Sequence, residues 1–284
     1  MVRHAGRPVN PRTAALFADA RAESRAALIG YLPAGFPTVE ASTSLIDEML
    51  AGGVDLVEVG LPYSDPLMDG VAIQDAVQIA LAEGTTTHDV LSIVERISLS
   101  GSQAAVVMSY WNPIERFGLQ SFVDRLAAAG GSGVITPDLT PEEAGPWIAA
   151  TDSNDIDRTF LVAPSSTDAR IRTVAETCTG FVYAASTMGV TGARDQVSNA
   201  APTLVERVRG CTSAPIGVGL GVSSADQAAG IAGYADGVIV GSAFVRRILD
   251  AGDLAAARAS VRAFAEELAE GVRRPVDRIP VTAN

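Results

Sequence analysis

Short apolar runs alternate with amphipathic segments along almost the whole chain. Eight runs rich in β-branched and aliphatic residues have the length and composition of buried strands. They cover residues 27–32, 56–59, 105–110, 133–135, 159–162, 180–183, 216–219 and 237–240. The segments between them place apolar residues at helical spacing. These predicted helices include residues 39–51, 74–82, 119–129, 141–150, 168–177 and 224–232.

This alternation predicts a fold of the α/β class. Eight strand–helix alternations in roughly 250 residues are typical of a closed parallel (β/α)8 TIM barrel. An open doubly wound sheet would need a glycine-rich dinucleotide loop after its first strand, and residues 30–37 do not match that fingerprint. Residues 11–25 predict an extra N-terminal helix that covers the N-terminal mouth of the barrel, and residues 254–270 predict the helix that closes the ring.

Composition favours a compact enzyme without a membrane span. Hydrophobic residues make up 48% of the 284 residues, and no apolar stretch is long enough to cross a bilayer. We found no linker, so we expect residues 1–284 to form one barrel domain with frayed ends at 1–10 and 272–284. The first ten residues lack the apolar core of a secretory signal, which predicts a cytoplasmic protein.

Net charge and cysteine content indicate which classes of ligand the protein can bind. The formal charge of -12 argues against nucleic acid or an anionic membrane as a partner. An anionic small substrate would then need local backbone donors. Cys178 and Cys211 lack metal-ligand spacing and are interpreted as free thiols, and two histidines in the whole chain argue against a metal site.

A carboxylate lies inside one of the predicted strands. Over residues 56–60, alternation puts Val57 and Val59 on one face and Glu58 on the other. If both faces are buried, the pKa of Glu58 should rise, which suits a general acid near neutral pH. The alternative is that Glu58 reaches solvent or pairs with an arginine. Two more carboxylates, Asp65 and Asp69, follow on the next loop.

Barrel geometry brings these groups to one face. Residues at the carboxyl ends of the strands, and on the loops after them, line the face where active sites of this fold lie. The candidates on that face are Glu58, Asp69, Tyr110, Asp138 and Tyr183.

Two glycine-rich loops predict an anion site on the same face. Residues 217–224 and 240–246 follow the seventh and eighth strands, and each enters a helix through glycine and serine. Helix N-termini in these two loops are the usual phosphate position on this barrel. Either loop alone could be a plain tight connection. Residues 183–194 form a long loop after the sixth strand, which is either a lid or an ordinary surface loop.

These motifs together resemble the α subunit of tryptophan synthase over residues 12–270. The similarity lies in Glu58-Val-Gly-Leu-Pro-Tyr-Ser-Asp-Pro-Leu-Met-Asp-Gly70 and in the loop motifs at residues 189–192, 219–223 and 241–242. The resemblance implies a carbon–carbon lyase that cleaves indole-3-glycerol phosphate to indole and glyceraldehyde 3-phosphate. It also implies no cofactor in this chain and an α2β2 heterotetramer, in which indole passes to a β subunit that carries pyridoxal phosphate.

The resemblance also assigns roles to residues. It implies that Glu58 protonates C3 of the indole ring, that Asp69 holds the indole N–H, that Tyr183 lies close to Glu58, and that Thr191 bonds Asp69 when the lid closes. The implied indole slot is Tyr31, Met108, Tyr110, Ile135 and Leu161. The implied phosphate site is Gly192, Gly221, Gly241 and Ser242. The implied partner interface includes Asp65, Pro66 and Asn112.

Two departures from the family and two competing hypotheses remain. Phe36 and Thr187 stand where the family often has Asp and Arg. Loss of the arginine removes an ion pair, so we expect lid closure, or its coupling to the partner, to be weaker or to use other contacts. The first competing hypothesis is another phosphate-binding barrel enzyme. Sugar-phosphate epimerases require metal-binding His and Asp, and indole-glycerol-phosphate synthase requires lysines at the strand ends. The predicted strands contain no lysine, which argues against the synthase. An inactive barrel that only activates or scaffolds a partner is the alternative function, and loss of Glu58 or Asp69 would favour it. Both carboxylates are present.

Overall fold

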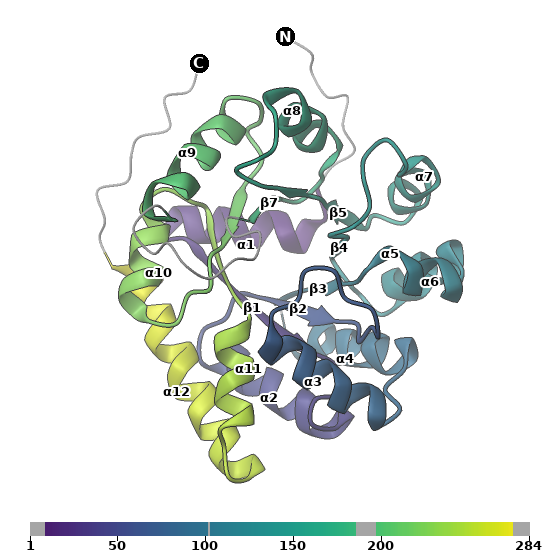
Figure 1. Ribbon diagram of the computed structural model, residues 1–284, viewed down its shortest axis with the longest axis vertical. Coiled ribbons are helices and arrows are strands. Elements are labelled where there is room, and N and C mark those ends of the chain that lie inside the picture. Colours follow the sequence, from purple (N-terminus) through teal and green to yellow (C-terminus); the bar gives the residue numbers. More distant parts are fainter. Residues whose placement is uncertain (1–8, 102, 186–196, 275–284) are drawn as a thin grey trace.

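The computed structural model describes residues 9–101, 103–185 and 197–274, and Figure 1 shows their strands surrounded by helices. The strands are β1 (Ala27–Pro33), β2 (Leu56–Gly60), β3 (Ala104–Met108), β4 (Gly133–Ile135), β5 (Asp157–Thr159), β6 (Leu161–Val162), β7 (Val182–Ala185), β8 (Ile216–Gly219) and β9 (Gly237–Val240). All of their pairings are parallel.

The sheet closes into a barrel because its two edge strands are consecutive in the chain. Its strand order is β5-β4-β3-β2-β1-β9-β8-β7-β6. The two edge strands, β5 and β6, are separated only by Phe160, so they are two halves of one barrel position. The nine segments therefore correspond to the eight predicted strands, and the predicted TIM barrel is confirmed.

The helices form the outer layer of the barrel (Figure 1). They are α1 (Pro11–Ala22), α2 (Val39–Ala51), α3 (Val71–Ala82), α4 (Thr87–Ser100), α5 (Trp111–Phe117), α6 (Leu119–Ala128), α7 (Gly145–Ser153), α8 (Asp168–Thr177), α9 (Val197–Arg209), α10 (Ala225–Ala232), α11 (Ser242–Leu249) and α12 (Leu254–Arg273). The prediction for residues 141–150 placed that helix too early, because 141–143 form a turn and Pro146 occupies the first turn of α7.

Two apolar cores confirm the alternation along the strands. Val57 and Val59 belong to the large core between the strands and the helices. Leu56 belongs to a smaller core inside the barrel, together with Ile29 and Phe181. Since alternate residues of β2 face opposite sides, Glu58 shares the interior face with Leu56.

Helix α1 covers the end of the barrel where the strands begin. Phe17 is buried and packs against Phe181, with ring centroids 5.8 Å apart. The backbone N–H of Asn10 donates to Oδ1 of Asp157 at 3.1 Å, which ties the start of α1 to the start of β5. The predicted N-terminal cover is therefore present, and it leaves the opposite end of the barrel open for chemistry.

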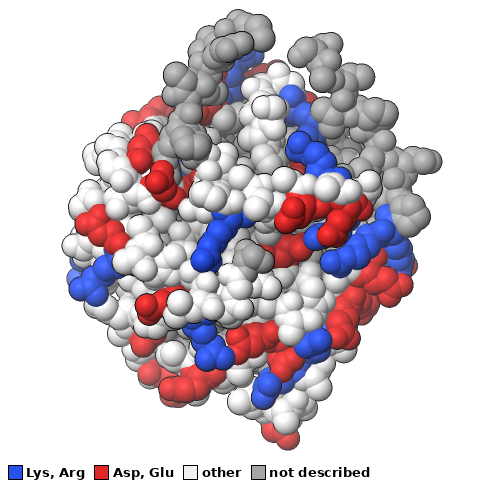
Figure 2. Space-filling view, turned by 180° about the vertical axis from the view of Figure 1, so that it is seen from behind, with Lys and Arg blue, Asp and Glu red and all other residues white. Residues whose placement is uncertain are grey.

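The surface carries charges of both signs. On the face seen in Figure 2, acidic and basic side chains are intermixed in small groups and do not form a broad basic surface. Within the described ranges, none of the helices combines the length and the hydropathy needed to cross a membrane.

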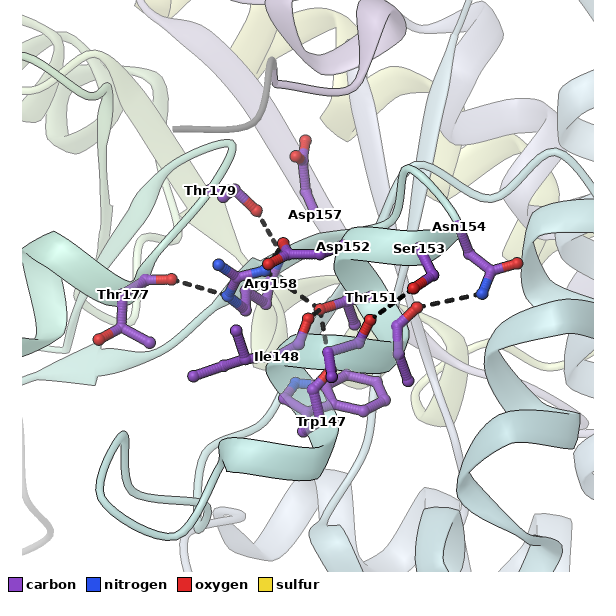
Figure 3. Close-up of polar contacts among 12 residues, drawn as sticks. Trp147, Ile148, Thr151, Asp152, Ser153, Asn154, Asp157, Arg158, Thr177 and Thr179 are labelled. Atoms are coloured by element: carbon purple, nitrogen blue, oxygen red, sulfur yellow. Dashed lines mark hydrogen bonds and ion pairs between the residues drawn. The ribbon is translucent and has the colours of Figure 1, made fainter. Parts of the chain in front are cut away.

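A polar network fixes β5 to its neighbouring helices (Figure 3). The buried Arg158 forms an ion pair with Asp152 at the end of α7 and donates from Nε to the carbonyl of Thr177 at 2.8 Å. Its Nη1 also donates to Oγ1 of Thr151 at 3.1 Å, and its backbone N–H donates to Oγ1 of Thr179 at 3.0 Å. A buried guanidinium is stable only when its donors are satisfied, so this network holds α7 and the end of α8 against the strand.

Candidate active site

A cavity of about 270 Å³ lies at the carboxyl ends of the strands. It is lined by residues of β1, β2, β3, β6 and β7 and of the loops after β2, β8 and β9. The sequence-predicted residues among its lining are Tyr31, Glu58, Asp69, Met108, Leu161, Tyr183, Gly221, Gly241 and Ser242. The tertiary structure thus brings together residues that lie far apart in the sequence.

Glu58 is a buried carboxyl group that faces this cavity. The side chain is 1% exposed, and Oε1 has no hydrogen-bond partner among the described residues. Burial raises the pKa of Glu58 to about 8, because the charged form loses its hydration. The group is therefore mostly protonated at neutral pH. The alternative of a Glu58 exposed to solvent or paired with an arginine finds no support in the described contacts.

Asp69 lies on the loop between β2 and α3 in a different environment. The hydroxyl of Tyr110 donates to Oδ1 of Asp69 at 3.1 Å, and Nε2 of Gln74 donates to the Asp69 carbonyl at 2.7 Å. Burial raises the pKa of Asp69, while the hydrogen bond from Tyr110 lowers it. The backbone N–H groups of Leu67 and Met68 donate to the Tyr110 hydroxyl oxygen, at 3.2 and 3.0 Å, and hold the loop in place. The two carboxyl groups therefore differ, because only Asp69 receives a hydrogen bond that favours its ionised form.

Two tyrosines, the buried Tyr31 and the partly buried Tyr183, line the same cavity, and each packs closely against a glycine. A Cβ atom built on Gly60 would lie 2.5 Å from the Tyr31 hydroxyl, and one on Gly219 would lie 2.7 Å from the Tyr183 hydroxyl. Only glycine allows such close approach. Burial raises the pKa of both phenols well above the usual value, and the neighbouring Glu58 raises that of Tyr183 further. Both phenols are therefore neutral at physiological pH.

The loops after β8 and β9 also line the cavity. Gly221 has a φ of +66°, and a Cβ built there would meet no described atom within 4 Å, so the space beside its backbone is open. Gly241 precedes α11, and no described side chain caps the first amides of that helix. Ser224, in contrast, caps α10 by accepting from the N–H of Gln227. Uncapped amides at Ser242 are available to an anion.

Several predicted residues lie elsewhere. Ile135 is fully buried in the interior core and does not border the cavity, and Tyr110 reaches Asp69 without lining the cavity. Asp138 accepts from the backbone N–H of Trp111 and so caps the start of α5. Thr191 and Gly192, like most of the long loop predicted at residues 183–194, lie outside the described residues, as do most of the predicted frayed ends.

Of the predicted interface residues, Asp65 and Pro66 lie on the loop after β2 that carries Asp69, and Asn112 lies at the start of α5. Asp65 and Asn112 are exposed and Pro66 is half-buried. Asn112 donates from Nδ2 to the Tyr63 hydroxyl at 3.0 Å, which links the start of α5 to the loop after β2.

Some residues that line the cavity were not predicted from the sequence. Met68, Ile73, Leu220 and Arg246 also border the cavity. Arg246 lies one turn after Ser242 on α11, so helical spacing from the predicted phosphate loop could have found it. Among the described residues, no group of His, Cys, Asp and Glu side chains is arranged to hold a metal ion, and the two cysteines are free and half-buried.

Comparison with known proteins identifies this arrangement. The family model for the tryptophan synthase alpha chain matches residues 17–273. The tryptophan synthase alpha chain of Thermobifida fusca is 59% identical over 259 residues, which are 90% of this chain and 96% of that protein. The one of Acidothermus cellulolyticus is 58% identical over 254 residues, or 89% and 94%. The chain belongs to the tryptophan synthase alpha chain family.

The solved structures agree with this membership. A structure of Mycobacterium tuberculosis tryptophan synthase superposes with a TM-score of 0.87 and 53% identity, and covers 93% of this chain and 99% of that one. Family membership makes the chain a lyase of tryptophan biosynthesis, whose reaction is the cleavage of indole-3-glycerol phosphate. The alpha chain of this family needs no cofactor of its own and works with a β subunit. The inactive-scaffold alternative is not supported.

Proposed function

We propose that Glu58 is the general acid of a retro-aldol cleavage and that Asp69 stabilises the charge it creates. Breaking the bond between indole C3 and the glycerol carbon first requires a proton on C3. Glu58 carries that proton at neutral pH because its pKa is about 8. The indole nitrogen becomes positive as C3 is protonated, and an ionised Asp69 accepts a hydrogen bond from the N–H. Two carboxyl groups in unlike environments can divide these tasks.

The remaining proton transfer completes the cleavage. As the carbon–carbon bond breaks, the glycerol hydroxyl must lose its proton so that it becomes the aldehyde of glyceraldehyde 3-phosphate. We assign this proton to Glu58, which is a carboxylate after its first transfer and regains its starting state. Tyr183, partly buried beside Glu58, positions that carboxyl group. Thr191 is proposed to bond Asp69 when the lid closes.

The cavity provides separate sites for the two ends of the substrate. Tyr31, Met108 and Leu161 offer an apolar slot for the indole ring. Gly221, Gly241 and Ser242 offer backbone amides to the phosphate, and we add Gly192 from the family pattern.

We place the partner on the loops around Asp69. Leu67 and Val71 are each 76% exposed, and Met68 is 42% exposed, which is unusual for large apolar side chains around a catalytic loop. With Asp65, Pro66 and Asn112 they form the proposed contact surface for a β subunit that carries pyridoxal phosphate. We propose an α2β2 heterotetramer in the cytoplasm, with indole passed directly across this surface.

One observation carries the mechanism: Glu58 is buried, its Oε1 has no hydrogen-bond partner among the described residues, and it lines the cavity that also holds Asp69. The test is the release of indole from indole-3-glycerol phosphate by the purified chain, with and without a β subunit. Glu58→Gln keeps the shape but carries no transferable proton, so we expect a loss of about 10²- to 10⁴-fold in kcat with the fold retained. A Glu58→Gln protein that turns over like the wild type would remove Glu58 from the mechanism.

A further inference from the structure

Arg246 is the cation among the described residues that line the cavity. The predicted phosphate contacts at Gly221, Gly241 and Ser242 are backbone or hydroxyl donors without charge. A protein with a net charge of -12 repels a phosphorylated substrate at long range, so a local positive charge would have a clear effect.

The position of Arg246 directs it toward those donors. It lies four residues after Ser242 on α11, so the two residues share one face of the helix and are about 6 Å apart along its axis. Long side chains on a helix lean toward its N-terminus. Arg246 is exposed and lines the cavity together with Gly241 and Ser242, where α11 begins with uncapped amides.

The guanidinium of Arg246 has no other described role. It forms no ion pair with a described residue, whereas Arg258, Arg209 and Arg25 all pair with carboxylates. The adjacent Arg247 has a different function, because its guanidinium stacks over the ring of Phe264 at 3.9 Å from the centroid. An arginine near the C-terminus of α11 also stabilises the helix dipole, but that effect does not require it to border a cavity.

We propose that Arg246 is a specificity-determining residue that binds the phosphate of the substrate and selects phosphorylated over unphosphorylated indole glycerol. This inference rests on the phosphate site proposed above. The guanidinium supplies charge and paired N–H donors to the phosphate oxygens that the amides leave free. Because it is exposed, it acts on substrate capture and not on the carbon–carbon bond.

The test compares Arg246→Gln with Arg247→Gln, which makes the same charge change one residue along α11. We expect Arg246→Gln to raise the KM for indole-3-glycerol phosphate about two- to fivefold, as expected for an exposed ion pair, with kcat within about twofold. The effect should shrink between about 0.01 M and about 1 M ionic strength. Arg246→Lys should restore part of the loss, and Arg247→Gln should leave KM unchanged. Indole glycerol without phosphate should be handled alike by all of these proteins.

Two outcomes would overturn the inference in distinguishable ways. If Gly221→Ala raises KM but Arg246→Gln does not, the phosphate site stands and the role of Arg246 is rejected. If neither change affects KM, the phosphate site itself is misplaced and the inference fails with it. Equal losses with phosphorylated and unphosphorylated substrate in Arg246→Gln would show a structural effect and would also reject the proposal.

Discussion

At the scale of single residues, burial decides the chemistry of Glu58. A carboxyl group at a strand end would ionise near its usual pKa if water reached it. Inside the barrel the carboxyl group is buried and Oε1 has no described partner, so the neutral form is favoured. Asp69 is also largely shielded, but the Tyr110 hydroxyl donates to it and stabilises its charge. The difference between acid and anion thus comes from the surroundings and not from the residue type.

We expect kcat/KM to fall as the pH rises through about 8, because only the protonated form of Glu58 can donate. The loss should approach about tenfold per pH unit on the alkaline side. The measurement is a pH profile of indole release by the wild-type chain. The alkaline limb is the informative one, because the substrate phosphate itself titrates near pH 6. A profile that stays flat to about pH 10 would contradict the assignment of Glu58 as the acid.

At the scale of elements, the loop after β8 holds its shape by a glycine in the left-handed region. Gly221 has a φ of +66°, which side chains rarely adopt, and open space beside it. Gly84 offers a matched case, with a φ of +80° and no described atom within 4 Å of a built Cβ, but it lies after α3 and does not line the cavity.

Alanine at either glycine should lower the free energy of unfolding by a similar amount, about 1 kcal/mol, because both positions have a positive φ that strains alanine. Only Gly221→Ala also puts a methyl group where the phosphate is proposed to bind. We therefore expect Gly221→Ala to raise the KM for indole-3-glycerol phosphate, while Gly84→Ala leaves it unchanged. Thermal unfolding and steady-state kinetics of both variants measure this. An equal KM in the two variants would place the phosphate elsewhere.

The network around Arg158 gives a second element-scale prediction. Arg158→Met keeps the apolar stem but removes the donors to Asp152 and Thr177, so we expect a loss of about 1–3 kcal/mol in the free energy of unfolding. Arg170→Met breaks an exposed ion pair with Glu142 and should cost less than about 1 kcal/mol. Denaturant unfolding of both variants tests this contrast, and similar losses would mean that the network adds no stability. KM should not change, because Arg158 lies near the start of the strands.

At the scale of the whole molecule, the open end of the barrel combines the cavity with an exposed apolar surface. A surface leucine beside the active site is proposed to contact the β subunit, whereas one at the other end of the barrel is free of such a role. Leu67 and Leu99 provide this pair, because they are 76% and 82% exposed and Leu99 lies at the end of α4, next to the start of β3.

Leu67→Gln should therefore weaken binding of a β subunit and lower the activation of indole release by up to about tenfold, since the few residues that dominate an interface, clustered near its centre, each cost more than about 1 kcal/mol when replaced. Leu99→Gln should bind and respond like the wild type. Asp65→Ala should keep the activity of the isolated chain and reduce activation. Titration of each variant with the β subunit gives affinity and activation together. If Leu67→Gln and Leu99→Gln behave alike, the interface does not include this loop.

The sequence by itself determined the barrel and the side on which its carboxylates lie. Side chains recur on one face at a fixed spacing in strands and in helices, so this spacing is visible in the sequence. The alternation around Val57 and Val59 was therefore sufficient to predict that Glu58 faces the barrel interior. The glycine-rich loops after the last two strands were also visible, because the chain must turn there. These are local properties, and a linear pattern can carry them.

Tertiary structure decided what surrounds each group. It left Glu58 without a described partner for Oε1, turned Tyr110 toward Asp69, buried Ile135 in the interior core, and brought Arg246 to the cavity. It also split the fifth barrel strand at Phe160 and closed the ring there. Such relations join residues far apart in the chain, and their distances depend on how the closed barrel packs. The spacing of apolar residues in the sequence determines which face of its element a side chain lies on. Only tertiary packing determines which other residues it contacts there.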